Sequence, residues 1–229
     1  MWRNLFNLFR KDTLFTQAMS ESHQMLDIDL QMFEASVESL RRSNDGSIQV
    51  DLKGMDKEIN RFERDVREKV LTHLAVSGPS DIASGLVLVS IVIDIERIGD
   101  YAKNIYDLAC YHPERLHGGS MEEAVADVEA RTTSLFREMV RAFRENDQEK
   151  AREIMTSYKG ALSTDCEKIV ERIVGGKAPD LSGGTGAAIA LYVRYLKRIG
   201  GHSRNIVTSV VNPFPRIGYR YKKNKSSNF

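Results

Sequence analysis

The chain is poor in residues that interrupt or cross-link a fold. Its 229 residues include only five prolines and two cysteines. Cys110 and Cys166 have no spacing typical of zinc ligands, and two cysteines cannot build a disulfide framework. We therefore expect two free thiols in the protein core and a reducing compartment.

Long apolar runs are also missing. The most apolar segment, Gly85–Ile93, ends at Asp94 and is far shorter than the ~20 residues that a membrane-spanning helix needs. The N-terminus lacks the long apolar stretch and the small-residue cleavage site of a secretory signal. A cytoplasmic protein is therefore expected.

Neither a dominant charge nor a catalytic motif is present. The 33 lysines and arginines nearly balance the 32 aspartates and glutamates, so no nucleic-acid partner is expected. The only Glu-x-x-His, Glu114–His117, falls in the loop expected over residues 112–120 and not on a helix, as the di-iron sites of helical bundles require. The chain has no GxxxxGK[ST] phosphate loop. These absences argue against an enzyme.

Helical periodicity is what the chain does have. Between clusters of glycine and proline, apolar residues recur every three or four positions, and no convincing strand alternation occurs. The pattern predicts an all-α fold with six main helices. They are carried by Phe15 to Leu40, Leu52 to Val70, Asp81 to Cys110, Val125 to Phe143, Gln148 to Val174 and Gly184 to Val211.

An internal repeat divides these helices into two sets of three. The segment Glu96–Ile105 aligns with Lys197–Ile206, which lies 101 residues later (197 minus 96). Each copy falls in the third helix of its set, which predicts pseudo-two-fold character. We divide the chain into an amphipathic N-terminal segment (1–14), a first repeat (15–112), a second repeat (120–211) and a basic C-terminal tail (212–229).

The repeated segment resembles the signature of the PhoU-domain family, which is close to Glu-Arg-Ile-Gly-Asp-His-Ala-x-Asn-Ile. Asp56–Glu63 is similar to the family's Asp-x-x-(Ile/Val)-Asn-x-x-Glu pattern, and the resemblance covers roughly Met19 to Val211. It implies two tandem antiparallel three-helix bundles, a homodimer, and metal at the acidic motifs. It also implies a regulatory adaptor in phosphate uptake, with a membrane phosphate transporter or a sensor histidine kinase as its partner.

The acidic motif can be read as a metal site. Glu96 and Asp100 lie four residues apart on one helical face and can hold one hard cation between them, or one each. Asp56, Asn60 and Glu63 share a face of the second helix and can complete an oxygen-rich site. The candidate metals are iron, zinc, manganese, magnesium and calcium.

Two observations argue against a metal in both repeats. An acidic helical face is usually only a solvated surface, and Arg97 and Arg198 are competing partners that can pair with acids of neighbouring helices. In the second repeat the acidic positions have become Lys197 and Gly201, so a metal is expected only in the first half.

The two ends of the chain lie outside the signature. The apolar side chains between Trp2 and Phe9, with Arg3, Arg10 and Lys11, suit the inner surface of a membrane or a partner's groove. The alternative is that they pack on their own bundle or on a dimer mate. From Arg216 onward the tail is basic, and we expect it to be loosely ordered.

Two further functions remain open at this point. One is a metal-dependent helical-bundle enzyme that uses Glu96 and Asp100 in an open site. The other is a structural module for oligomerisation.

Overall fold

The structure is a bundle of long helices. The computed structural model describes residues 13–77, 79–112, 114–157 and 161–219, and this part of the chain contains seven α-helices and no strand. The predicted N-terminal amphipathic residues, up to residue 12, and the tail from residue 220 lie outside it. The α-helices are α2 (Leu14–Arg42), α3 (Leu52–Ser77), α4 (Ile82–Tyr111), α5 (Glu122–Glu145), α6 (Gln148–Ser157), α7 (Ala161–Val174) and α8 (Gly183–Val211).

Local side chains fix the ends of several helices. Thr13 and Ser182 are the N-caps of α2 and α8, and their hydroxyl oxygens accept hydrogen bonds from Thr16 N and Thr185 N at 3.2 and 3.1 Å. Asn146, with φ of 50°, ends α5 in the left-handed conformation. The predicted turn at residues 145–147 therefore forms.

One predicted helix is in fact two. The sequence pattern predicted a continuous helix over Gln148–Val174, whereas the structure has α6 and α7 on either side of residues 158–160. Both pieces pack on α8.

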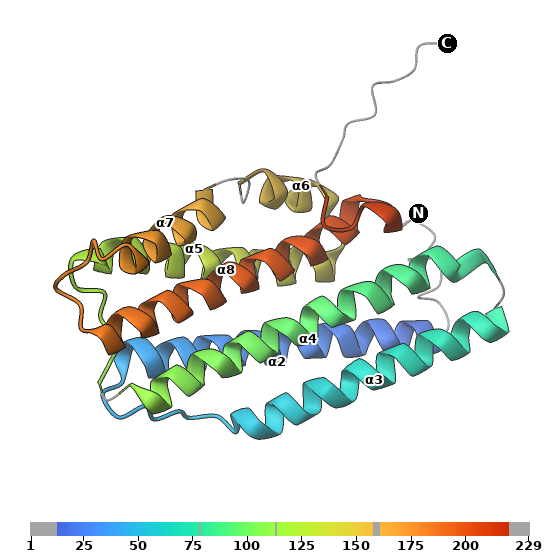
Figure 1. Ribbon diagram of the computed structural model, residues 1–229. Coiled ribbons are helices and arrows are strands. Elements are labelled where there is room, and N and C mark those ends of the chain that lie inside the picture. The colour runs from blue at the N-terminus through green and yellow to red at the C-terminus, as the bar shows by residue number, and fades with distance from the viewer. Residues whose placement is uncertain (1–12, 78, 113, 158–160, 220–229) are drawn as a thin grey trace, which may run out of the picture.

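Two three-helix units lie side by side (Figure 1). Helices α2, α3 and α4 pack together, and α5 packs with α6, α7 and α8. The units meet where α4 crosses α8 and where α2 touches α5. The prediction of two tandem three-helix bundles is confirmed. In the second bundle, α6 and α7 together take the place of the one helix predicted over Gln148–Val174.

Pairs of side chains between the units show the pseudo-two-fold relation. Arg42 of the first unit pairs with Glu129 at 3.1 Å, and Arg144 of the second pairs with Asp27 at 2.5 Å. A shift of 102 residues (144 minus 42) turns one pair into the other. Between α4 and α8, Tyr101 stacks on His202 with ring centroids 5.8 Å apart, and these two residues are themselves equivalent in the repeat.

A buried charge network joins the units. The Arg41 side chain, 7% exposed, donates to Glu129 at 2.9 Å and to Glu122 at 2.5 Å. Tyr192 on α8, which is fully buried, donates its hydroxyl to the same Glu129 carboxylate at 2.9 Å. Helices α2, α5 and α8 therefore meet at one arginine.

Two predictions for the thiols and the tail need correction. Cys166 is buried as expected, but Cys110 is exposed. Its position at the end of α4 leaves it on the surface. The start of the tail is ordered, because Asn212 Nδ2 donates to the backbone oxygens of Arg216 and Tyr219 at 3.0 and 2.8 Å. None of the described helices is long and apolar enough to cross a bilayer.

Candidate metal centre in the first repeat

The motif on α4 places two carboxylates one helical turn apart. The Glu96 and Asp100 side chains are 15% and 29% exposed. Arg97, which lies between them in the sequence, donates to Asp100 at 3.0 Å and lies 3.5 Å from Glu96. The predicted pairing of Arg97 and Arg198 with acids of neighbouring helices is wrong, because Arg198 donates to the Tyr101 hydroxyl at 3.1 Å.

Helix α3 brings its polar residues to the same place. Lys103 of α4 bridges the two helices, with its ammonium group 2.8 Å from Asp56 Oδ1 and 3.4 Å from Asp100 Oδ1. Asn60 donates its side-chain amide to the Asp56 backbone oxygen at 2.8 Å, and Glu63 pairs with Arg67 at 2.7 Å. The acidic groups of the predicted site therefore already have cationic partners from the chain.

Opposing effects act on the pKa of Lys103. Burial lowers this pKa, but the hydrogen bond and charge of Asp56 and the charge of Asp100 outweigh burial and raise it. Lys103 therefore stays protonated. It supplies the positive charge that a bound cation would otherwise provide.

A fifth acidic residue, Asp29 of α2, lies beneath the other four. It has no exposed surface, and among the described residues neither of its carboxylate oxygens has a hydrogen-bond partner. Burial raises its pKa well above the usual range, and the charges of Glu96, Asp100 and Asp56 raise it further. A buried, unpartnered carboxyl is costly, so its presence points to a cation or a proton as its missing partner.

Gly99 makes room for this carboxyl. A Cβ at position 99 would lie 2.6 Å from Asp29 Oδ1 and 3.0 Å from Ile59 Cδ1. The glycine of the motif therefore has a packing reason, which is the close approach of α2 to α4. Sequence reasoning missed Asp29. The available signal was an aspartate on the apolar stripe between Leu26 and Phe33.

The pKa of Glu96 is raised as well. Burial raises its pKa, and the charges of Asp100 and Glu63 raise it too, whereas Arg97 and Lys103 act in the opposite direction. The side chains of three helices thus form one acidic cluster, which we define as Asp29, Asp56, Glu63, Glu96 and Asp100. Its unbalanced negative charge would attract a cation.

The donor set fits a hard cation, but it is not preorganised around one. All the donors are oxygen atoms, the kind that magnesium, calcium and manganese prefer. Within the part of the chain that the structure describes, no three His, Cys, Asp or Glu side chains converge closely enough to hold a metal. Lys103 lies between Asp56 and Asp100, so a metal would bind here by displacing its ammonium group.

The second repeat has no acid at three of the equivalent positions, and two of them carry cations. Arg131 replaces Asp29 and Lys197 replaces Glu96, while Gly201 replaces Asp100. Arg131 pairs with Asp165 at 3.0 Å, and Lys197 pairs with Glu167.

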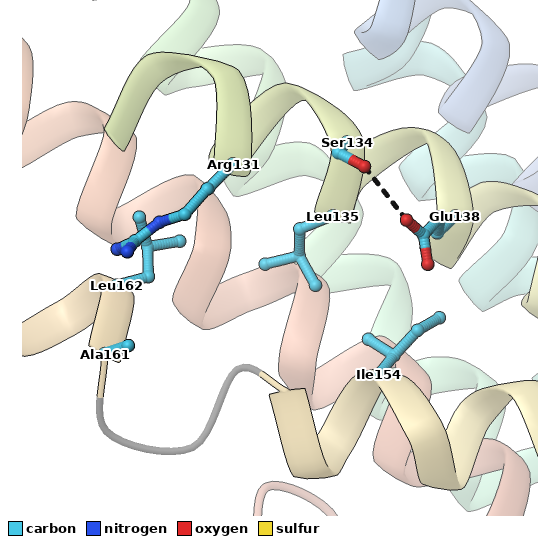
Figure 2. A pocket seen from close by; sticks show the side chains of 7 residues that line it. All are labelled: Arg131, Ser134, Leu135, Glu138, Ile154, Ala161 and Leu162. Carbon is cyan, nitrogen blue, oxygen red and sulfur yellow. Dashed lines mark hydrogen bonds between the residues drawn. The ribbon is translucent and has the colours of Figure 1, made fainter. Parts of the chain in front are cut away.

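The neighbouring pocket in the second repeat, of about 190 Å³, is not an oxygen-rich site (Figure 2). Arg131 lies at one end, and Ser134 donates to Glu138 at 2.9 Å at the other. Apolar Leu135 lies between these ends, and the pocket is also lined by apolar Leu162 and Ile154.

The fold and the site together define a class: a helical protein of two tandem three-helix repeats, with an acidic cluster in the first repeat only. The family model of the PhoU domain matches residues 23–109 and again residues 125–210. The chain therefore belongs to the PhoU-domain family, as the motif resemblance indicated.

Individual relatives agree with this assignment. The chain is 24% identical over 182 residues to the "Phosphate-specific transport system accessory protein PhoU homolog" of Clostridium acetobutylicum, covering 76% of this chain and 80% of that protein. It is also 24% identical to the "Phosphate-specific transport system accessory protein PhoU homolog 1" of Thermotoga maritima, covering 86% and 85%. Among solved structures, PhoU from Pseudomonas aeruginosa superposes with a TM-score of 0.72 at 22% identity, covering 86% of this chain and 95% of that one.

The space around Asp29 gives a first testable prediction. Gly99→Ala should destabilise the protein by about 1–3 kcal/mol in urea unfolding, because the new methyl group overlaps Asp29 and Ile59. The matched control is Gly201→Ala, which meets no atom within 4 Å and should stabilise by up to about 1 kcal/mol. Combining Gly99→Ala with Asp29→Ala should recover part of the loss. Equal effects at the two glycines would contradict this packing.

The raised pKa of Asp29 gives a second prediction. An acid whose pKa is raised by folding contributes most stability below its unfolded pKa, near 3.8, and loses that contribution as pH rises. In the presence of EDTA, the unfolding free energy of the wild type relative to Asp29→Asn should therefore fall as the pH rises above about 4. A pH-independent difference at Asp29 would show that its carboxyl is not perturbed.

Proposed function

We propose that this chain is a regulatory adaptor of phosphate uptake, without catalytic activity of its own. The observation that carries this proposal is the match of both repeats to the PhoU domain, in relatives whose names describe accessory proteins of phosphate-specific transport. The adaptor would act in the cytoplasm, at the inner face of the membrane. Its partner would be a phosphate transporter or the sensor histidine kinase that responds to phosphate.

A metal ion at the acidic cluster is the second part of the proposal. Glu96, Asp100 and Asp56 would hold it, with Asn60 and Glu63 beside them and Asp29 beneath. The ion would supply the positive charge that the buried Asp29 carboxylate lacks. This is supported by the two carboxylate oxygens of Asp29, which have no hydrogen-bond partner among the described residues. They lie in a cluster whose donor atoms are all oxygen.

The adaptor role can be tested in the cell of origin. Deleting the gene should raise phosphate uptake and phosphate-starvation transcription when phosphate is plentiful, since the adaptor would act as a negative regulator. Reintroducing the intact chain should restore both. A pull-down from membranes at high and low phosphate would then tell a transporter from a kinase. Unchanged uptake and unchanged transcription in the deletion strain would overturn the proposal.

The metal can be tested on the purified protein. After EDTA treatment, the chain should rebind one of Mn²⁺, Fe²⁺, Zn²⁺, Mg²⁺ or Ca²⁺, measured by elemental analysis after gel filtration. The Glu96→Gln/Asp100→Asn variant should bind that metal about tenfold more weakly or worse. The matched control, Glu167→Gln/Glu171→Gln, changes two acids of the second repeat and should bind as the wild type does. Equal metal content in all three proteins would exclude this site.

A further inference from the structure

The end of the bundle where α3 turns into α4 has apolar side chains that the described fold leaves exposed. Val76, near the end of α3, is 78% exposed. Ile82, Leu86 and Ile93 follow along the outward side of α4 and are 45%, 41% and 41% exposed. We define these four residues as the hairpin patch. Large aliphatic side chains that are exposed together mark a surface at which something binds.

The hairpin patch has almost no charge of its own, but one of its borders is acidic. Within residues 70–93 the only acidic or basic side chain besides His73 is Asp81, and the two are hydrogen-bonded at 3.0 Å. Beyond the patch, Glu96 and Asp100 continue along the outward side of α4. A cover for the patch therefore needs apolar side chains and a cation that faces Glu96. An anionic membrane surface fits poorly, because the carboxylates would face its headgroups.

The chain enters the bundle beside this patch. Helices α2 and α4 run in the same direction from one end of the molecule (Figure 1), and Asp29 of α2 lies level with Gly99 of α4. Sixteen residues earlier (29 − 13 and 99 − 83) are Thr13 and Ala83. Since every helical residue rises 1.5 Å, the start of α2 is level with the first turn of α4. Residues 1–12, which lie outside the described part of the chain, therefore join the bundle at this end.

The sequence of residues 1–12 has the composition that such a cover needs. It contains the cations Arg3, Arg10 and Lys11. Twelve residues can span up to ~40 Å. Helix α4 is only about 10 Å across, and its part of the patch is about 16 Å long. The segment is therefore long enough to pass the end of α4 and to lie along the patch. Its large apolar side chains are Trp2, Leu5, Phe6, Leu8 and Phe9.

We infer that residues 1–12 cover the hairpin patch of their own chain. Their apolar side chains would pack on the exposed aliphatic ones, and Arg3, the cation farthest from α2, would face Glu96. A segment attached at Thr13 has an effective concentration on the order of millimolar, which favours it over a separate partner. This inference does not depend on the proposed role in phosphate uptake.

Trp2 makes the contact measurable, because it is the only tryptophan among the 229 residues. Its fluorescence emission and its quenching by acrylamide report on the surroundings of residue 2. The patch variant is Leu86→Lys/Ile93→Lys. The matched control, Val174→Lys/Leu191→Lys, changes two apolar residues of the second repeat that are 80% and 44% exposed. Circular dichroism on thermal unfolding checks that both full-length variants fold, and EDTA keeps metal away from the acidic cluster.

In the folded wild type, Trp2 should emit at a shorter wavelength than in urea and should be protected from acrylamide. The patch variant should shift the emission to the value in urea and lose this protection, because two lysines remove apolar contacts and repel the cations of the segment. The control should behave as the wild type does.

Three results would overturn the inference. The first is a Trp2 that is solvated in the wild type, or equally protected in the folded patch variant. The second is protection that disappears on dilution, because the segment would then cover the patch of another copy. The third is protection that appears only when phosphatidylglycerol vesicles are added, because the segment would then bind lipid.

Discussion

The relative placement of the two repeats depends on the buried guanidinium group of Arg41. An arginine that is 7% exposed must be paired, and its partners Glu122 and Glu129 come from the other repeat. Tyr192 adds the third helix, α8, by donating to the same Glu129 carboxylate. A buried ion pair adds little net stability, but leaving one member alone is costly, so the network favours one docking of the units over others. That docking places α4 beside α8.

The same backbone supports opposite electrostatics in its two halves. Asp29 and Glu96 in the first repeat correspond to Arg131 and Lys197 in the second. The first half therefore has carboxylates at positions where the second half has cations. In the second half, Arg131 and Lys197 are themselves the cations, and they pair with acids of α7. A duplicated bundle can diverge in this way because helix packing is set by its apolar stripes, which both copies keep.

Much of the fold could be predicted because helices are specified by local periodicity and by their caps. Ser182 caps the start of α8, and residues 145–147 form the turn that ends α5, as their residue types indicate. The division of the predicted fifth helix into α6 and α7 was missed, because its apolar positions keep a helical period along both pieces. Among the site residues, the pattern found Glu96 and Asp100. It could not show that Lys103 lies between Asp56 and Asp100, because that contact joins two helices.

By itself, the sequence determined the helices, the repeat and the acidic face of α4, all of which follow from spacing along one chain. The tertiary structure decided which charges are buried and what they meet. Asp29 looks like any polar residue on a long helix until α4 packs over it at Gly99 and removes it from water. Whether a carboxylate is solvated or left without a partner depends on neighbours distant in sequence, and only the packed bundle brings those neighbours together.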